Sequence, residues 1–415
     1  MALKLKVEVR DFIKDSFRSY YSSSFIEAPS DISRREFGFI FIGQEGMRRH
    51  LSFKSLEDLR RFLISEVPLH AYFSSAYYDF PDVEDMDGKV WRGADLVFDI
   101  DADHIPTPCK EVHDSWRCLD CGFSSKGMAP TECPNCSSRR IETDYWFCDL
   151  CLDAARDEAF RLVEEFLVSE FGFSIKDMII VFSGHRGYHI HVRDKTAFEL
   201  SIEARREITD YIRGIGLSVE LHGFPSKSSS DIPPPSLSDF GWRGRLIRAI
   251  YDFICSASLS DLKLILGERI GRIVYENRSL ILSSFESSPP KWPIINGLSM
   301  KVWGKLASKL LDRVVIHIDE RVTSDIKRLM RLPSSIHGKT GLIAKSMSIG
   351  FLDNFQPIFD ASAFGFEDFK IHVFHMPKIL IGGNFYGPYR DEDVLLPKTI
   401  AMYLICRGSA TLLNG

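Results

Sequence analysis

Six cysteines of this 415-residue chain stand in three CxxC pairs. The pairs are Cys118-x2-Cys121, Cys133-x2-Cys136 and Cys148-x2-Cys151, and eleven residues separate each pair from the next. A CxxC turn lets two thiolates reach one tetrahedral Zn²⁺ ion, each at about 2.3 Å. The first two pairs therefore predict one zinc site, with Cys118, Cys121, Cys133 and Cys136 as its ligands.

The third pair, Cys148 and Cys151, needs two further ligands to close a second site. Cys109 and His113, which stand four residues apart, are the nearest candidates, and His104 is another. The pairs could also combine in a different order. Zinc with four protein ligands has no open position for chemistry, so both sites are expected to serve folding.

The remaining two cysteines, Cys255 and Cys406, lie alone in apolar stretches, and we expect both to be buried as small hydrophobic side chains. Tight clustering of the other seven favours metal binding over disulfides in a chain whose thiols stay reduced.

A pair of acids, Asp99 and Asp101, ends the apolar run Ala94–Ile100, which predicts a buried strand. Residues i and i+2 of a strand face the same side, so the two carboxylates would repel each other unless a cation lies between them. Oxygen ligands of this kind suit Mg²⁺ or Mn²⁺. Paired acids also occur at ordinary strand ends, and Asp103 is expected to be a solvated acid in the following turn.

A third acid, Asp319, ends a second predicted strand, Arg313–Ile318. It could join Asp99 and Asp101 around a pair of ions. Transfer of a phosphoryl group to a hydroxyl needs such a pair, because one ion lowers the pKa of the hydroxyl and the other holds the leaving oxygen. His317 points the opposite way on such a strand and is expected to be structural.

A basic turn, Ser183–His189, joins the predicted strands Met178–Phe182 and His189–Val192. Its two glycines let a ligand approach the backbone closely. Ser183, Arg186 and His189 could then donate to phosphate oxygens, although a plain hairpin with a surface arginine fits the same residues. The window 301–350 adds ten Lys and Arg residues against four acids, which suits contact with phosphates.

Both helical and strand patterns surround these residues in the sequence, so we predict a mixed α/β fold. Helices are expected over 4–20, from a capping box at Ser55, over Asp153–Glu170 and through most of 201–309. Strands are expected at Phe37–Phe41 and as short irregular pieces past Ile349, and Pro225–Ser238 is expected to be a loop. The predicted division is a catalytic core (1–103, 153–200, 310–415), a zinc-binding insertion (104–152) and a helical insertion (201–309).

Composition excludes several classes of protein. Hydrophobic residues are 45% and charged residues 26%, as in ordinary globular proteins, and the formal net charge of −5 means that any nucleic-acid surface must be local. Charges throughout the first 22 residues argue against a signal peptide, and no apolar run is long enough to cross a bilayer. We expect a cytoplasmic protein.

These motifs together resemble the small subunit of the archaeo-eukaryotic primases. The resemblance rests on LVFDID (Leu96–Asp101), CxxC before a helix, SGHRGYH (Ser183–His189), Ile318-Asp319 and the run Arg331–Gly341, with REFGF (Arg35–Phe39) and Arg49 as weaker support. The motifs follow the family's order from about Arg35 to Gly341. His185 departs from the pattern, because some relatives have arginine there.

The resemblance implies a primase catalytic core with a zinc-binding insertion and a helical subdomain. It implies that Asp99, Asp101 and Asp319 bind catalytic Mg²⁺ or Mn²⁺, that Ser183, Arg186, His189, Arg331 and His337 hold a nucleoside triphosphate, and that Glu36 and Arg49 line the site. The implied partners are single-stranded DNA and a large primase subunit in a heterodimer. The implied activity is synthesis of short RNA primers on the DNA template, and the resemblance also allows DNA primers made from deoxynucleotides. The alternatives are a primase-fold repair polymerase and a non-enzymatic zinc-ribbon protein that binds nucleic acid.

Overall fold

A computed structural model describes residues 6–224 and 233–413 and divides the chain into two compact units. Unit 1 comprises Met1–Glu164, Phe173–Thr209 and His317–Gly415, and unit 2 comprises Glu165–Gly172 and Asp210–Ile316. Most of the predicted loop 225–238 lies outside the described residues. The predicted mixed α/β class is confirmed. None of the helices in the described ranges is both long and apolar enough to cross a membrane.

Unit 1 is built around two four-stranded antiparallel sheets, of order β12-β3-β1-β2 and β13-β10-β11-β6. Their strands are β1 (Phe37–Ile40), β2 (Arg48–Leu51), β3 (His70–Ser74), β6 (Leu96–Asp101), β10 (Met178–Phe182), β11 (Gly187–Val192), β12 (Leu329–Arg331) and β13 (Lys345–Met347). The hairpin β4 (Ala76–Tyr78) and β5 (Trp91–Ala94) lies between β3 and β6 in the chain.

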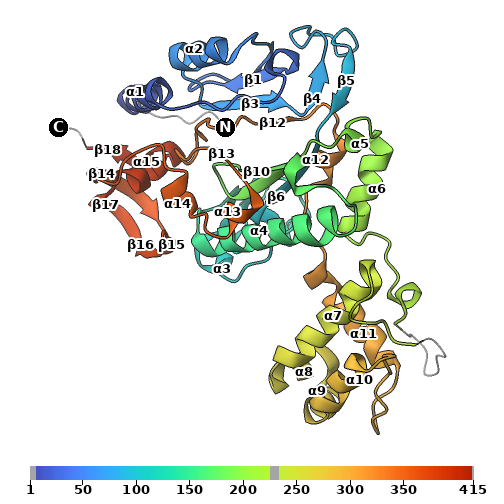
Figure 1. Ribbon diagram of the computed structural model, residues 1–415. Helices are drawn as coiled ribbons and strands as arrows, with labels where there is room; N and C mark the ends of the chain where they lie inside the picture. Colours follow the sequence, from blue (N-terminus) through green and yellow to red (C-terminus); the bar gives the residue numbers. More distant parts are fainter. Residues whose placement is uncertain (1–5, 225–232, 414–415) are drawn as a thin grey trace. The chain divides into compact units, whose positions relative to one another are not determined.

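Helices cover the two sheets. In Figure 1, α1 (Val7–Ser23) and α2 (Leu56–Glu66) lie above the first sheet, and α4 (Asp149–Arg161) lies below the second. Helix α1 buries Val9, Ile13, Phe17 and Tyr21, whose spacing of four residues makes one apolar face. Of the capping box predicted at Ser55, the N-cap hydrogen bond is present: the Ser55 hydroxyl oxygen accepts from the Asp58 N–H at 3.2 Å.

A buried arginine ties the first sheet to the start of β6. The Arg35 guanidinium pairs with Asp95 at 2.9 Å and donates to the carbonyl oxygens of Ser74 and Ser75 at 2.9 and 2.7 Å. Arg205, also buried, donates to the Asp95 carbonyl oxygen at 2.9 Å. A buried charge is stable only when an ion pair and hydrogen bonds satisfy it. These contacts therefore also fix where β6 enters the second sheet.

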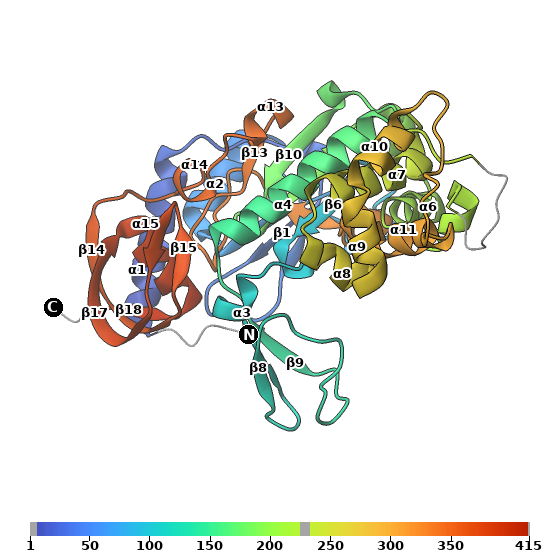
Figure 2. The same cartoon turned by 90° about the horizontal axis from the view of Figure 1, so that it is seen from below.

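The cysteine-rich segment forms a three-stranded sheet of order β8-β7-β9, which Figure 2 shows extending beyond α3. Its elements are α3 (Lys110–His113), β7 (Ser115–Cys118), β8 (Ser124–Lys126) and β9 (Ile141–Asp144). The C-terminal part adds the sheet β17-β14-β18, the hairpin β15-β16 and three helices. In chain order, the elements of this C-terminal part are α13 (Ile349–Leu352), α14 (Pro357–Asp360), β14 (Asp368–Met376), β15 (Ile379–Ile381), β16 (Asn384–Tyr386), β17 (Tyr389–Pro397), α15 (Lys398–Arg407) and β18 (Ala410–Leu412).

Unit 2 is helical, as its sequence pattern predicts. Its helices include α7 (Gly241–Ser256), α8 (Leu259–Leu266), α9 (Glu268–Glu276), α10 (Arg278–Glu286) and α11 (Lys301–Val314). Helices α5 (Lys195–Phe198) and α12 (Glu320–Ser324) belong to unit 1, and α6 (Ile202–Ile212) crosses the boundary between the two units. Trp292 stacks on Trp303 with ring centres 5.9 Å apart, and the Arg245 guanidinium lies 3.4 Å from the Phe166 ring centre.

Four local predictions were wrong in whole or in part. The stretch 313–318 is not a strand, because α11 continues its buried stripe of Leu306, Leu310 and Val314, and only Ile318 bridges to Ile100. The helix predicted over 153–170 begins at Asp149 and becomes a π-helix at Leu162–Val168. The strands predicted past Ile349 are present as β14 to β18, but the prediction missed the buried helix α15, because burial from all sides hides helical periodicity. Cys255 is exposed, whereas Cys406 is buried as expected.

Candidate active site and metal centres

A small cavity of about 190 Å³ is lined by residues of both four-stranded sheets of unit 1 and of the segments beside them. The residues that line it are Tyr72, Asp99, Asp101, Ser183, His185, His189, Val322, Arg328, Leu329, Met330, Arg331 and His337. Six of them were predicted as site residues: Asp99, Asp101, Ser183, His189, Arg331 and His337. The structure thus gathers most of the predicted site into one hollow. Arg186, Asp319, Glu36 and Arg49 are not among its lining residues.

The acidic wall of the cavity is set by strand register. Asp99 and Asp101 of β6 pair with His189 and Gly187 of β11, so both carboxylates leave the same side of the sheet. A side chain at Gly187 would collide with the Ile100 carbonyl oxygen, since an added Cβ would lie 2.1 Å from it. Glycine at this position therefore allows β11 to approach β6 closely.

The third predicted acid, Asp319, joins this wall through the backbone. Its N–H donates to the Asp99 carbonyl oxygen at 3.0 Å, and Ile318 bridges Ile100. Burial and the nearby charges of Asp101 and Asp319 raise the pKa of Asp99 to about 8. A carboxylate is held partly neutral in this way when acids crowd together without a balancing cation, and this donor set of carboxylate oxygens suits a divalent cation such as Mg²⁺ or Mn²⁺.

Nitrogen donors also line the cavity. Arg331 is buried, its guanidinium lies 4.4 Å from the Tyr72 ring centre, and its Nη1 lies 2.8 Å from His70 Nδ1. His189 Nε2 lies 3.5 Å from an Asp99 carboxylate oxygen, and burial lowers the pKa of His189 to about 3. His189 is therefore a neutral donor or acceptor at neutral pH rather than a cation.

The histidine at position 185 is neutral as well. Burial lowers the pKa of His185 to about 3, and its ring stacks on His337 with centres 4.8 Å apart. Gly184, at φ of 76°, brings the turn against His337, since an added Cβ would lie 2.9 Å from the His337 Cβ. His185, at the position where some relatives have arginine, therefore contributes a packed neutral imidazole to the cavity and no positive charge.

Sequence reasoning missed three contributors to this cavity and its walls. Tyr72 and His70 come from β3, whose residues carried no chemical motif. Arg328 lies in the basic window, which pointed to the region and not to the residue. Pairing of β12 with β3 places Arg331 opposite Tyr72, and that pairing is what brings these groups to the cavity.

Arg186, which the resemblance implies would hold the triphosphate, is not among the residues that line the cavity. Its side chain is fully buried, and its Nη1 lies 3.1 Å from an Asp103 carboxylate oxygen while its Nη2 lies 3.3 Å from one of Asp114. The guanidinium is not among the groups that line the cavity, because it lies between Asp103, in the turn after β6, and Asp114, beside the cysteine-rich segment. Asp103 is accordingly an ion-pair partner and not the solvated acid predicted from the sequence.

Glu36 and Arg49 form a separate cluster outside the cavity lining. The Glu36 carboxylate is fully buried, accepts a hydrogen bond from Arg49 Nε at 3.0 Å and lies 3.4 Å from Lys89 Nζ. His317, predicted to be structural, lies with Nδ1 2.6 Å from a Glu158 carboxylate oxygen. These pairs hold the sheets and α4 in place around the cavity.

The first two CxxC pairs come together as one cluster, as predicted. The sulfurs of Cys118 and Cys136, and those of Cys121 and Cys133, lie 3.6 Å apart. Ligand atoms of the four residues all lie within 4.8 Å of one another. Four sulfurs at about 2.3 Å from one tetrahedral ion would stand roughly 3.8 Å apart, so this geometry fits Zn²⁺.

The third pair forms a second cluster with Cys109 and His113, which settles the alternatives left open by the sequence. Cys109 and Cys151 sulfurs lie 3.4 Å apart, and His113 Nε2 lies 3.8 Å from the Cys151 sulfur. His104 is exposed and is not part of either cluster. Three sulfurs and one imidazole nitrogen also suit a closed, structural Zn²⁺ site.

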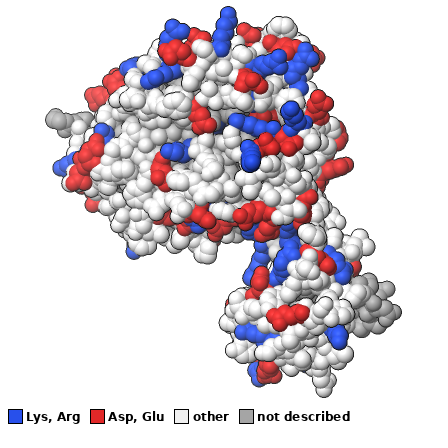
Figure 3. All heavy atoms as spheres, viewed as in Figure 1, with Lys and Arg blue, Asp and Glu red and all other residues white. Residues whose placement is uncertain are grey.

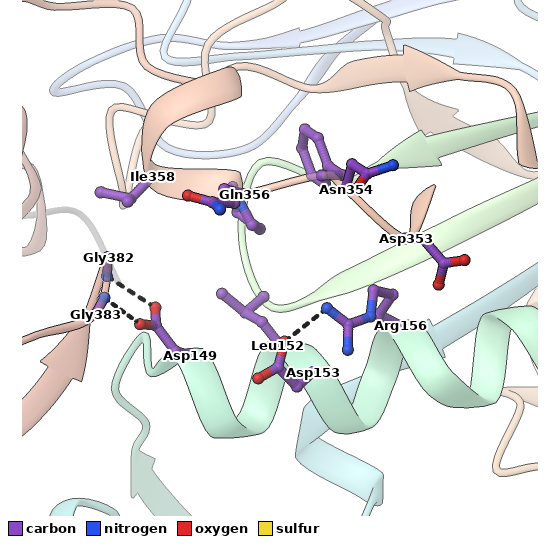
Figure 4. A pocket seen from close by; sticks show the side chains of 12 residues that line it. Asp149, Leu152, Asp153, Arg156, Asp353, Asn354, Gln356, Ile358, Gly382 and Gly383 are labelled. Carbon is purple, nitrogen blue, oxygen red and sulfur yellow. Dashed lines mark hydrogen bonds and ion pairs between the residues drawn. The ribbon is translucent and has the colours of Figure 1, made fainter. Parts of the chain in front are cut away.

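A second hollow, of about 380 Å³, lies beside α4 (Figure 4). Its polar groups are used within the chain: Asp149 accepts hydrogen bonds from the Gly382 and Gly383 N–H groups at 3.0 and 2.8 Å. Arg156 pairs with Asp153 at 2.9 Å and with Asp157 at 3.1 Å. These contacts fasten the β15-β16 turn to α4, and the groups they satisfy offer no obvious ligand chemistry.

Charge on the surface is mixed. Figure 3 shows basic and acidic side chains interspersed over the visible face of unit 1. The basic window 301–350 contributes Arg328 and Arg331 to the cavity and the exposed Lys339 nearby, so its effect is local, as the net charge of −5 requires.

Comparisons with known proteins agree with this assembly. Residues 142–349 match the family model described as DNA primase small subunit. The chain is 32% identical to the DNA primase small subunit PriS of Methanothrix thermoacetophila, over 96% of this chain and 98% of that protein. It is 33% identical to the PriS protein of Methanocella arvoryzae, over 97% and 98% of the two chains, and 32% identical to that of Archaeoglobus fulgidus, over 96% and 98%. The chain therefore belongs to the DNA primase small subunit family.

Proposed function

We propose that the chain starts RNA primers on single-stranded DNA by nucleotidyl transfer at Asp99, Asp101 and Asp319. Membership of the family makes the chain a DNA primase subunit and a nucleotidyltransferase. The observation that carries the assignment of the site is the meeting of Asp99 and Asp101 with buried nitrogen donors at one cavity, with Asp319 close enough for its charge to act on Asp99. A zinc-ribbon protein without activity would have no need of that arrangement.

The three carboxylates would hold the catalytic metal ions. Their crowding raises the pKa of Asp99 to about 8, which fits a site completed by divalent cations. Bound Mg²⁺ or Mn²⁺ would supply Lewis acidity, lowering the pKa of the attacking hydroxyl and neutralising the triphosphate. Asp99 and Asp101 would be the main ligands, since their side chains line the cavity. Asp319, the N-cap residue of α12, would complete the set from beside β6.

The basic side of the cavity would bind the triphosphate of the incoming nucleotide. Arg331 offers a planar guanidinium with a fixed direction, because Tyr72 and His70 pack against it. Ser183 is free to donate its hydroxyl hydrogen, since its oxygen already accepts from the N–H groups of His185 and Gly187. His189 and His337 would add neutral donors. Arg328, also on the lining, would add charge.

Other parts of the proposal extend beyond the cavity. We propose a heterodimer with a large primase subunit, template DNA and nucleoside triphosphates as the partners, and a primase catalytic core as the fold of unit 1. The division into core, zinc-binding insertion (104–152) and helical insertion (201–309) stays a prediction. Location in the cytoplasm also stays a prediction.

Unprimed synthesis on single-stranded DNA tests the proposal. The purified chain is given ribonucleotides or deoxynucleotides with Mg²⁺ or Mn²⁺, and products are separated by length. Asp99→Asn and Asp101→Asn should each reduce product at least about 100-fold, because loss of one metal ligand removes several kcal/mol of transition-state stabilisation. The control is Asp353→Asn, an acid beside the second hollow, which should stay within about twofold of the unmodified chain.

The outcomes separate the alternatives. Full activity of the Asp99 and Asp101 variants would remove these residues from the reaction. Extension of existing ends with deoxynucleotides, without any unprimed product, would favour a repair polymerase.

A further inference from the structure

The cysteine-histidine centre formed by Cys109, His113, Cys148 and Cys151 lies next to the turn that follows Asp101. Between the two stands the fully buried side chain of Arg186. A buried guanidinium stays charged, so it needs acids or hydrogen-bond acceptors around it. The residues that supply them show which parts of the fold Arg186 connects.

On the side of the acids, Arg186 holds the turn after β6. Its Nη1 lies 3.1 Å from an Asp103 carboxylate oxygen. The Asp103 N–H in turn donates to the Asp101 carboxylate at 2.9 Å, and the Arg186 carbonyl oxygen accepts from the Ala102 N–H at 3.0 Å. Movement of Arg186 would therefore move the donor that orients Asp101.

On the side of the cysteines, Arg186 contacts both a ligand and the partner of a ligand. Its Nη2 donates to the Cys151 sulfur at 3.7 Å and to an Asp114 carboxylate oxygen at 3.3 Å. The other Asp114 oxygen lies 2.7 Å from His113 Nδ1, which leaves His113 Nε2 directed at the cluster. A carboxylate behind a metal-binding histidine fixes its tautomer and ring orientation.

The charges on the two sides are complementary. Zn²⁺ bound by three thiolates and a neutral imidazole carries one net negative charge, which a neighbouring guanidinium stabilises. Asp103 and Asp114 bring two further negative charges to the same guanidinium. Without the metal, the four ligand side chains lose the ion that would hold them together, so the contacts of Arg186 on this side would weaken.

We propose that Arg186 is a positioning residue that couples the Cys109–His113–Cys148–Cys151 centre to the carboxylate of Asp101, so that metal in this centre sets the rate of nucleotidyl transfer. The part that concerns rate rests on the proposed function. The coupling itself is a property of the protein without substrate. Arg186 in this role never touches the triphosphate.

The test compares Arg186→Gln, Arg186→Lys and Asp114→Asn with the unmodified chain in two assays. Release of zinc to a colorimetric chelator, measured without nucleotides, should become at least about 10-fold faster for one of two bound ions in Arg186→Gln and Asp114→Asn, the size typical of losses around a metal ligand. In steady-state primer synthesis the same variants should lose kcat at least about 10-fold, while the KM for nucleotide stays within about twofold.

Two further variants sharpen the result. Combining Arg186→Gln with Asp114→Asn should cost little more than either change alone, because both break the same link. Arg186→Lys keeps the charge but reaches fewer partners, so it should recover part of kcat and of zinc retention. The matched control is Arg156→Gln, which also removes a guanidinium paired with two acids, and it should change neither assay.

Three outcomes overturn the proposal. One is a tenfold rise in the KM for nucleotide with zinc release unchanged, which would make Arg186 a triphosphate contact. Another is an Asp114→Asn variant with normal zinc release and normal kcat. The third is a loss of kcat in Arg186→Gln that the double variant multiplies. If Arg186→Gln does not fold, as judged by thermal unfolding, Arg186→Lys and Asp114→Asn decide. Failure of the proposed function would appear separately, in the Asp99→Asn and Asp101→Asn assays.

Discussion

The two cysteine clusters offer the same metal chemistry in very different surroundings. The cluster of Cys118, Cys121, Cys133 and Cys136 belongs to the turns of the small sheet β8-β7-β9, and two of its four cysteines are exposed. Ion pairs near it, such as Arg140 with Asp120 at 2.6 Å, are also exposed. Such a centre holds its own turns together, and exposed pairs around it contribute little to stability.

The cluster of Cys109, His113, Cys148 and Cys151 is embedded in the body of unit 1. Cys148 and Cys151 lie at the start of α4, the helix that packs on β6 and β11. Asp114 and Arg186 stand behind its ligands, and Lys110 reaches the turn after Asp101. The ligand sets of the two clusters alone predict only a role in folding. The difference between the clusters lies in the groups behind their ligands, and the proposed link to Asp101 depends on those groups.

The largest expected effect comes from removing a ligand of the embedded cluster. Cys151→Ser should reduce primer synthesis at least about 100-fold and lower the temperature of thermal unfolding, because loss of a structural metal withdraws folding free energy from the start of α4. Metal analysis should find one zinc fewer per chain. Normal primer synthesis by this variant would contradict the expectation that the embedded cluster, unlike the exposed one, affects catalysis.

An intermediate effect is expected at Lys110, which touches no metal ligand atom. Its buried ammonium donates to the carbonyl oxygens of Ala102 and Ile105, the latter at 2.7 Å, and so closes the turn after Asp101. Lys110→Met should lower the free energy of unfolding by about 1–3 kcal/mol, because it leaves these acceptors unsatisfied. We expect kcat to fall about tenfold.

Lys126 supplies the comparison for that experiment. It is exposed on β8, in the sheet that carries the other cluster. Lys126→Met should leave the unfolding free energy within about 0.5 kcal/mol of the unmodified chain. An equal loss of kcat in both lysine variants would indicate a general effect of charge rather than a role for the turn.

The smallest effect is expected in the exposed cluster. Cys136→Ser should remove one zinc per chain and leave the rate of dinucleotide formation within about threefold, because no hydrogen bond found in the described residues links this cluster directly to the acids. Metal analysis and initial rates measure the two quantities. Cys255→Ser, an exposed cysteine outside both clusters, controls for loss of a thiol. A loss of rate as large as that of Cys151→Ser would contradict the local role.

Much of this molecule followed from short-range spacing. The CxxC pairs, the facing of Asp99 and Asp101, the cap at Ser55 and the basic turn at Ser183 all depend on residues two to four positions apart. Backbone geometry fixes such relations wherever the element forms. The sequence named six of the twelve residues that line the cavity, four from local patterns and Arg331 and His337 from the resemblance.

Only the tertiary structure decided which distant segments meet. Packing beside β6 brings Asp319 to Asp99, and pairing of β12 with β3 brings Arg331 to Tyr72. The fold likewise closes the second cluster with Cys109 and His113, and it buries Arg186 between that cluster and Asp103. Contacts of this kind depend on burial and charge balance summed over the whole unit, and no local pattern of residue types encodes that sum.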